Sequence, residues 1–102
     1  MDFTLENYEC ETGTGLVLID FSARWCPPCR LQAPIIERVA EQMAGKAKIG
    51  TCDVDRQREL ALAVRIRHIP TILILKDGKE VCRLVGLQSE ARVIASLEEF
   101  LD

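Results

Sequence analysis

Two short apolar runs, residues 16–19 and 71–75, stand out along a chain whose other segments mix apolar and polar residues. Both runs are rich in branched residues and begin directly after a glycine or a proline, which is typical of strands buried on both faces. Residues 49–54 and 80–85 are more mixed, as expected of strands nearer the edge of a sheet. The pattern therefore predicts a sheet with the two apolar runs at its centre.

Apolar residues recur at helical spacing over residues 29–43, which predicts an amphipathic helix there. The apolar stripe consists of Leu31, Ile35, Val39 and Met43, widened by Ile36 and Ala40. A shorter helix is predicted over residues 57–64. The last helix should begin after Ser89, because a serine side chain at this position accepts a hydrogen bond from the first turn. Its apolar positions are Val93, Ile94, Leu97, Phe100 and Leu101.

Asp77 and Gly78 lie between the last two predicted strands and indicate a hairpin turn, so these strands should be antiparallel. The order of elements is strand, helix, strand, helix, hairpin and helix, preceded by residues 2–15, whose structure the pattern leaves open. This order predicts an α/β fold with one central mixed β-sheet sandwiched between helices. A chain of 102 residues has the usual size of one compact domain, so we expect a single domain over residues 1–102.

The composition is that of a globular protein, with 48% hydrophobic and 28% charged residues. A formal net charge of -3 gives no reason to expect nucleic acid or an anionic membrane surface as a partner. The N-terminus lacks the basic and apolar regions of a secretion signal, and no stretch approaches the ~20 apolar residues of a membrane span. We therefore expect a cytoplasmic protein.

The chain has five cysteines, an odd number that excludes a fully paired set of disulfides within one chain. Cys26 and Cys29 are closely spaced, whereas the other three are far apart in sequence. In a reducing cytosol, Cys10, Cys52 and Cys82 are expected to be free thiols that act as small apolar residues.

The candidate chemistry lies in Trp25-Cys26-Pro27-Pro28-Cys29, between a predicted buried strand and a helix. This position puts Cys26 at the helix N-terminus, where unpaired N–H groups and the helix dipole favour a thiolate, the nucleophile in disulfide exchange. Cys26 should therefore react with alkylating agents before Cys29, because it lies at the exposed helix end. Both prolines fall where helix N–H groups have no partner, so they stiffen the turn at little structural cost.

A two-residue spacing between cysteines also suits two ligands of a tetrahedral zinc site. Two further ligands would be needed, and His68 and Cys52 are the candidates. The chain has no second closely spaced pair of such residues, so the pattern favours redox chemistry and we expect no metal.

The chain resembles the thioredoxin family over nearly all of residues 16–101. The landmarks are Asp20-Phe21-Ser22-Ala23 ahead of the Trp-Cys motif, Pro34 in the helix, Ile69-Pro70-Thr71, Lys76-Asp77-Gly78 and Val85-Gly86. The resemblance implies a thioredoxin-like fold and the reduction of disulfides in substrate proteins. It also implies regeneration by a thioredoxin reductase and no cofactor in the chain itself, and we expect a monomer. A thiol oxidase or isomerase of the same fold, or a partner-binding subunit without catalysis, are the alternatives.

The resemblance assigns roles to three residues. Cys26 would attack the substrate disulfide, and Cys29 would resolve the mixed disulfide with help from Asp20, which matches a buried aspartate of the family. Strand alternation already places Asp20 on the same face as Leu16 and Leu18, where burial would raise its pKa. Without the family, an aspartate that reaches water at the strand end is the alternative.

The resemblance also predicts a substrate-binding surface. In the family, the residue that matches Pro70 follows a cis peptide bond facing the disulfide, and a substrate strand pairs with the backbone just before it, here Ile69. The sequence alone is equally compatible with a plain turn. Trp25, Pro27 and Pro28 complete the expected surface, and for Trp25 the alternative is packing in the interior.

The chain departs from the family pattern at three places. Pro27 stands where the commonest motif has glycine, which removes a possible N–H donor to the Cys26 thiolate. Thr51 stands where many bacterial members have a lysine beside the buried aspartate. The N-terminal segment is several residues shorter than usual, so the first helix should be truncated or replaced by a turn near Gly13 and Gly15.

Basic residues cluster in sequence around the Trp-Cys motif and Pro70. If the two segments converge as in the family, these residues would form a positive rim that attracts partners with acidic surfaces. Solvation of the surface by long side chains is the alternative. The residues are Arg24, Arg30, Arg65, Arg67 and His68.

Overall fold

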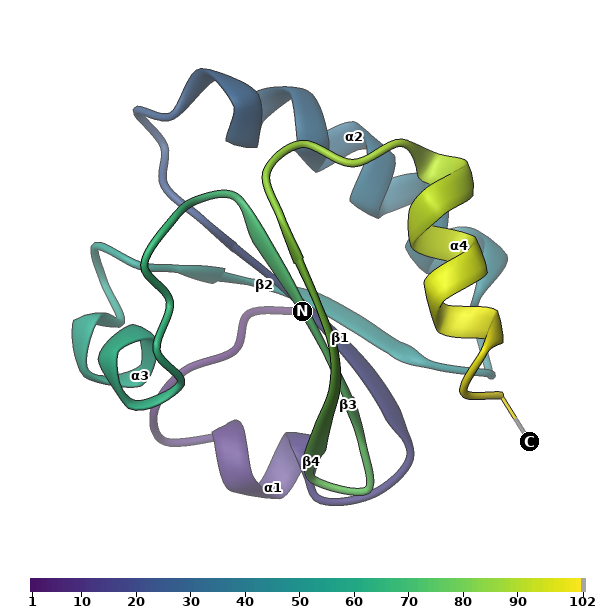
Figure 1. Ribbon diagram of the computed structural model, residues 1–102. Coiled ribbons are helices and arrows are strands. Elements are labelled where there is room, and N and C mark those ends of the chain that lie inside the picture. Colours follow the sequence, from purple (N-terminus) through teal and green to yellow (C-terminus); the bar gives the residue numbers. More distant parts are fainter. Residues whose placement is uncertain (102) are drawn as a thin grey trace.

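A four-stranded sheet with helices on both faces forms the protein in the computed structural model, which describes residues 1–101 (Figure 1). The strands are β1 (Leu16–Ser22), β2 (Lys48–Asp53), β3 (Thr71–Lys76) and β4 (Lys79–Val85). The helices are α1 (Tyr8–Thr12), α2 (Pro27–Gln42), α3 (Arg58–Ala63) and α4 (Glu90–Glu98). The predicted α/β fold with a central mixed sheet between helices is confirmed.

The strand order is β2-β1-β3-β4, so the two apolar runs lie at the centre of the sheet as predicted. β1 pairs with β2 in parallel and with β3 antiparallel, which makes the sheet mixed. β3 and β4 form the expected antiparallel hairpin. Its turn residues Asp77 and Gly78 have φ values of 50° and 84°, the left-handed conformation that a two-residue hairpin turn requires.

The side chains of β1 alternate between two hydrophobic clusters, one on each face of the sheet. Leu16 and Leu18 pack with buried residues of α2 and α4, whereas Val17, Ile19 and Phe21 pack on the opposite face with Phe3 and Leu60. α2 and α4 accordingly lie on one side of the sheet, and α1 and α3 on the other (Figure 1). By the same alternation, the side chain of Asp20, near the end of β1, lies on the face that α2 covers.

The buried face of α2 differs from the predicted stripe. Its buried residues are Cys29, Gln32, Ile36 and Val39, and Met43 at the C-cap is also buried. Leu31, which the four-residue spacing placed inside, is 62% exposed. Four residues turn an α-helix by about 40° beyond one full turn, so a strict four-residue repeat drifts off the face that alternating steps of three and four residues maintain.

The helix ends follow local capping. Ser89 is the N-cap of α4 as predicted, since its side chain accepts a hydrogen bond from the N–H of Arg92 at 3.1 Å. α4 ends at Glu98, so Phe100 and Leu101 lie beyond the helix that was predicted to include them, although both still pack against the cluster under α2 and α4. None of the helices within residues 1–101 has the length and apolar character needed to cross a membrane.

The N-terminal segment runs along the outer edge of β2, ahead of the five-residue helix α1. The N–H of Phe3 donates to the carbonyl of Thr51 at 2.8 Å, and the N–H of Thr51 donates to the carbonyl of Met1 at 2.8 Å. Gly50 makes this approach possible, because a Cβ atom there would lie 2.4 Å from the Met1 carbonyl oxygen and 2.7 Å from the Phe3 ring. A side chain at this position would therefore displace backbone.

Substituting Gly50→Ala should lower the free energy of unfolding by about 1–3 kcal/mol, because the added methyl group overpacks the contact between β2 and the N-terminal segment. Urea denaturation measures this loss, and amide hydrogen exchange should show faster exchange at Phe3 and Thr51. A variant with unchanged stability and exchange would show that the N-terminal segment does not lie against β2 as described.

Candidate active site

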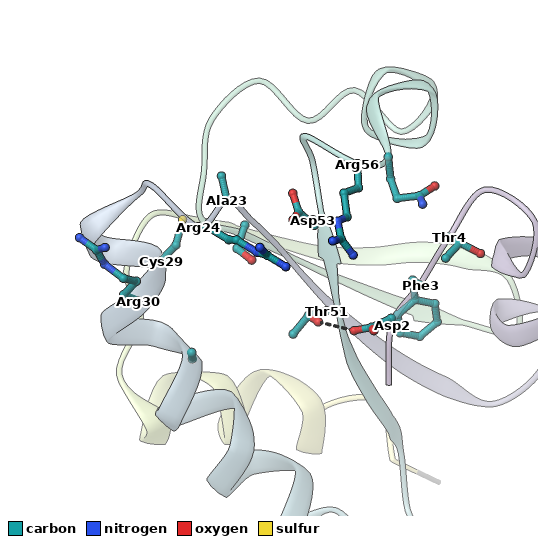
Figure 2. Close-up of a pocket in the computed structure, with 13 residues that line it drawn as sticks. Asp2, Phe3, Thr4, Ala23, Arg24, Cys29, Arg30, Thr51, Asp53 and Arg56 are labelled. Atoms are coloured by element: carbon teal, nitrogen blue, oxygen red, sulfur yellow. Dashed lines mark hydrogen bonds between the residues drawn. The ribbon is translucent and has the colours of Figure 1, made fainter.

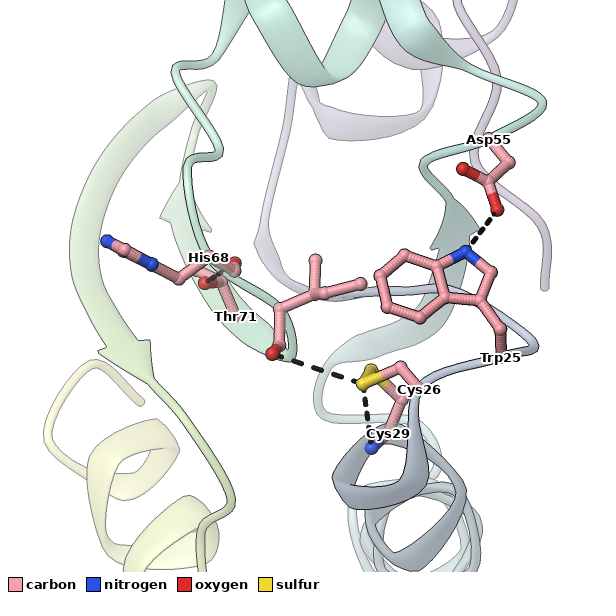
Figure 3. Close-up of a disulfide and its surroundings, with 7 residues drawn as sticks. Trp25, Cys26, Cys29, Asp55, His68 and Thr71 are labelled. Carbon is pink, nitrogen blue, oxygen red and sulfur yellow. Dashed lines mark hydrogen bonds between the residues drawn. A yellow bond between two sulfur atoms is a disulfide. The ribbon is translucent and has the colours of Figure 1, made fainter.

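Cys26 and Cys29 form a disulfide at the N-terminal end of α2, with their Cα atoms 5.2 Å apart. Cys26 is the N-cap of the helix, and the N–H of Cys29 donates to Cys26 Sγ at 3.3 Å (Figure 3). Pro27 and Pro28 occupy the first two helical positions and have no N–H, so the amide of Cys29 is the first that α2 presents. A helix-terminal N–H aimed at Cys26 Sγ favours negative charge on that sulfur in the reduced protein.

Both sulfur-bearing residues are buried, with 3% of Cys26 and 3% of Cys29 exposed. The expectation that Cys26 lies at an exposed helix end is therefore wrong. The neighbours Ala23, Val54 and Ile69 close over the pair. Because both residues are equally buried, exposure does not predict which sulfur is the more reactive. The two cysteines differ instead in that Cys26 is the N-cap of α2.

The peptide bond between Ile69 and Pro70 is cis, as the family resemblance implied. The Ile69 carbonyl oxygen lies 4.0 Å from Cys26 Sγ (Figure 3). Because a disulfide sulfur carries no proton, this is a contact rather than a hydrogen bond. The Trp-Cys motif and the Pro70 loop therefore converge at the disulfide.

Trp25 lies on the surface beside the disulfide, with 65% of the residue exposed, so the alternative of interior packing is wrong. Its indole Nε1–H donates to Asp55 Oδ2 at 2.8 Å, which holds the ring next to the cysteines (Figure 3). Asp55 follows β2 in the chain, and sequence reasoning missed it. A polar residue in a loop, 30 positions from its partner, gave no signal of this contact.

The four residues considered as zinc ligands do not meet. Cys52 lies in the hydrophobic cluster on the face of the sheet covered by α3. His68 is exposed, and its ring points away from the disulfide (Figure 3). Within residues 1–101, no group of three or more His, Cys, Asp or Glu side chains is arranged to hold a metal ion.

Asp20 is a buried carboxyl near the end of β1, on the face that α2 covers, and 1% of the residue is exposed. It pairs with Thr51 of β2 on one side and Ile72 of β3 on the other. Burial raises the pKa of Asp20 from 3.8 to about 6, in the direction that the strand pattern predicted, and the nearby Gln32 amide partly opposes this. The alternative in which Asp20 reaches water is wrong.

A cavity of about 390 Å³ opens between α2, β2 and the N-terminal segment, and Cys29 forms part of its wall (Figure 2). Its charged lining residues are Arg24, Arg30, Arg56, Asp2 and Asp53. Arg24 and Arg30 belong to the predicted basic rim, whereas Arg56 was not foreseen and Arg65 and Arg67 do not line this cavity. The two acidic groups partly balance the arginines, and Asp20 lies outside the lining.

The three remaining cysteines are free, and they differ in environment. Cys52 is buried, and burial, followed by the nearby charges of Asp53 and Asp2, raises its thiol pKa to about 11. Cys82 is half-buried, but Cys10 is exposed, which corrects the expectation that all three act as small core residues. α1 is so short that only Thr12 within it is buried, so Cys10 has no core to enter.

A pair of cysteines that can form a disulfide at a helix start, with an amide directed at one sulfur, is equipped for dithiol–disulfide exchange. In this fold the pair defines a thiol–disulfide oxidoreductase. Comparison with known proteins agrees: the sequence model of the Thioredoxin family matches residues 2–99. The chain belongs to the thioredoxin family.

Individual relatives are similar over most of their length. The thioredoxin of Bacillus subtilis is 42% identical over 85 residues, which cover 83% of this chain and 82% of the relative. The thioredoxin of Staphylococcus saprophyticus is 36% identical over 98 residues, which cover 96% and 94%. A solved structure of a mutant thioredoxin from Halobacterium salinarum superposes with a TM-score of 0.93 at 33% identity, covering 100% of this chain and 90% of that one. Family membership implies disulfide substrates and a reductase that restores the dithiol.

Alkylation of the native oxidised protein should modify Cys10 first, then Cys82, and Cys52 only on unfolding, because exposure falls in that order and the raised pKa of Cys52 suppresses its thiolate. Mass spectrometry after iodoacetamide treatment should also find one disulfide, between Cys26 and Cys29. A native bridge to any of the other three cysteines would contradict this assignment.

The free energy of unfolding should fall by about 3 kcal/mol as the pH rises from about 3 to about 7, through the contribution of Asp20 alone. The folded pKa of Asp20 lies above the unfolded value of 3.8, so the native state binds the proton more tightly and loses this advantage as the pH rises. Asp20→Asn should lack the decrease and be more stable than the parent above pH 6. Urea melts of both proteins across this range measure the difference.

Glu90 provides a control of opposite sign. Hydrogen bonds from Arg38 and Gln42 lower the pKa of its carboxyl, so its contribution to stability is present above the ordinary value of 4.5 and is lost as the pH falls. Glu90→Gln should therefore destabilise the protein at neutral pH but not at acidic pH. If the stability difference between Asp20→Asn and the parent does not depend on pH, Asp20 is not a buried ionising group.

Proposed function

We propose that the chain is a single thioredoxin domain that reduces disulfides in substrate proteins, with Cys26 as nucleophile, Cys29 as resolving thiol and Asp20 as the base for Cys29. The observation that carries the proposal is the hydrogen bond from the N–H of Cys29 to Cys26 Sγ at the N-cap of α2. This amide and the helix dipole favour the thiolate at Cys26 over that at Cys29.

The reaction proceeds in two exchanges. The Cys26 thiolate attacks one sulfur of the substrate disulfide, the substrate S–S bond breaks, and the departing substrate thiolate takes a proton from solvent. Cys29 then loses its proton to Asp20, and its thiolate attacks Cys26 Sγ in the mixed disulfide. The Cys26–Cys29 bond forms, the second substrate thiolate leaves, and the substrate has gained two electrons.

Asp20 is suited to the second exchange because its pKa of about 6 leaves it ionised at neutral pH but more basic than an ordinary aspartate. It lies on the face of β1 that α2 covers, and Cys29 is on the buried face of α2. The protonated carboxyl would later release its proton, which completes the cycle.

The substrate-binding surface of the proposal surrounds the disulfide. The N–H of Ile69 has no hydrogen-bond partner within residues 1–101, and its carbonyl contacts Cys26 Sγ. An extended substrate segment can therefore pair with the Ile69 backbone and bring its own disulfide to Cys26. Trp25, with Pro27 and Pro28 at the helix start, would supply apolar contact, and the buried Pro70 would support the Ile69 backbone.

We also propose the partners, oligomeric state and location of this protein. A thioredoxin reductase would restore the dithiol, so the chain would need no cofactor of its own, and the protein would act as a monomer. We place it in the cytoplasm, because a free and exposed thiol such as Cys10 is compatible with a reducing compartment.

Insulin reduction with dithiothreitol or a reductase tests the proposal. Cys26→Ser should abolish turnover, whereas Cys29→Ser should accumulate mixed disulfides with substrates because the second exchange is blocked. Cys10→Ser is the matched control and should keep full turnover. Trapping by Cys26→Ser instead would assign the nucleophile to the other sulfur, and turnover without Cys26 would indicate a binding module.

A further inference from the structure

Gln32 is a polar side chain on the buried face of α2, with 0% of the residue exposed. It lies one turn after Cys29 and one turn before Ile36, at a position where the rest of the face is apolar. A buried amide is unfavourable unless its donors and acceptor find partners. The neighbours of Gln32 therefore show what holds it there.

The loop between β4 and α4 fixes the orientation of the Gln32 amide. The backbone N–H of Gln88 donates to Gln32 Oε1 at 2.7 Å. An N–H group needs an acceptor, so this bond assigns the oxygen of the amide to the loop side and leaves the Nε2 donors to face elsewhere.

Gln32 Nε2 lacks an acceptor, and Asp20 Oδ1 lacks a donor. Within residues 1–101, Gln32 Nε2 and Asp20 Oδ1 are the two buried side-chain polar atoms without a hydrogen-bond partner. The two atoms do not form a hydrogen bond, yet the Gln32 amide is near enough to lower the pKa of Asp20 against the larger effect of burial. A buried donor and a buried acceptor thus each lack a hydrogen-bond partner inside the protein.

We propose that Gln32 is a positioning residue for Asp20: its Nε2–H group donates a hydrogen bond to the carboxylate when Asp20 ionises, while Gln88 anchors the other end of the amide. The inference rests on the proposed role of Asp20 as the base for Cys29. The proton of Cys29 passes to Asp20, and Gln32 neither gains nor loses one.

Among the residues around Asp20, Gln32 is the one that can donate this hydrogen bond. On β2 the neighbour is Thr51, whose hydroxyl donates to Asp2 Oδ1 at 3.3 Å. On β3 the neighbour is Ile72, which has no polar side chain. On the buried face of α2 the titratable residue is Cys29 itself, which is part of the reaction. The neighbouring strands therefore offer Asp20 no cation, and Gln32 on the helix side is an uncharged donor.

The parent protein allows a test that needs no substitution. In the oxidised state Cys29 does not titrate, so the carboxyl carbon of Asp20 can be followed by NMR as a function of pH. The side-chain amide resonances of Gln32 should shift with the same midpoint as Asp20. The side-chain amide of Gln88, which donates to the carbonyls of Val85 and Gly86, is the internal control and should not follow that midpoint.

Substitution then measures the effect. Gln32→Leu should raise the pKa of Asp20 by about one unit, because the ionised form loses a donor. Gln32→Met, which keeps the length of the side chain, should do the same. Ile36→Val changes packing on the same face without removing a donor and should leave the pKa of Asp20 unchanged.

Kinetics separate the inference from the proposed function. The pH midpoint for resolution of a preformed mixed disulfide should rise with the Asp20 pKa in Gln32→Leu, and the same substitution in an Asp20→Asn background should leave the profile unchanged. A raised pKa with an unaltered rate profile would uphold the contact and reject Asp20 as the base. An Asp20 pKa that neither variant moves, or Gln32 amide signals that ignore its titration, would overturn the inference.

Discussion

Burial of β1 on both faces and along both edges is the constraint on which the rest of the structure depends. Its first six residues are buried, β2 and β3 occupy its edges, and helices cover its faces. A slip of one residue in register would turn every side chain to the opposite face, so the core fixes the register strictly. Asp20 is the one ionisable side chain in this stretch, and the apolar residues before it determine that it faces α2. The core, rather than a mobile loop, thus positions the proposed base.

The start of α2 places the sulfur chemistry at the end of the same strand. Pro27 and Pro28 give up the two amides that a helix normally presents first, so stabilisation of the Cys26 thiolate relies on the Cys29 N–H and on the dipole of the whole helix. The amide that favours charge on the nucleophile therefore belongs to the residue that later attacks it. The motif makes the two cysteines interdependent through the backbone as well as through the disulfide.

The sequence predicted those features that follow from local pattern. Continuous apolar runs identified the central strands, and Ser89 identified the start of α4, because both signals are contained in a few neighbouring residues. The errors arose where packing in the folded protein was predicted from a local sequence pattern. A four-residue repeat placed Leu31 inside, position at a helix end made Cys26 seem exposed, and burial tendency placed Cys10 in a core that α1 does not reach.

The contacts that complete the site could not be predicted from local pattern, for a different reason. Trp25 and Asp55 are 30 residues apart, and Gln32 and Gln88 are 56 apart, so only the folded chain brings each pair together. One signal was nevertheless present: Gln32 interrupts an apolar helix face directly after the second cysteine. A polar residue at a core position next to a reactive group points to a polar partner inside.

The electrostatics of Asp20 show why a neutral partner suits this site. A carboxyl whose pKa is raised by burial destabilises the fold once it ionises, and proteins accept such a loss where the reaction needs the group. A cation beside Asp20 would reduce that loss, but it would also pull the pKa down and make the carboxylate a weaker base for Cys29. An amide held by a backbone N–H favours the charged form less strongly than a cation does. With Thr51 engaged by Asp2 and Gln32 on the helix side, Asp20 is ionised at neutral pH and still basic enough to take the proton.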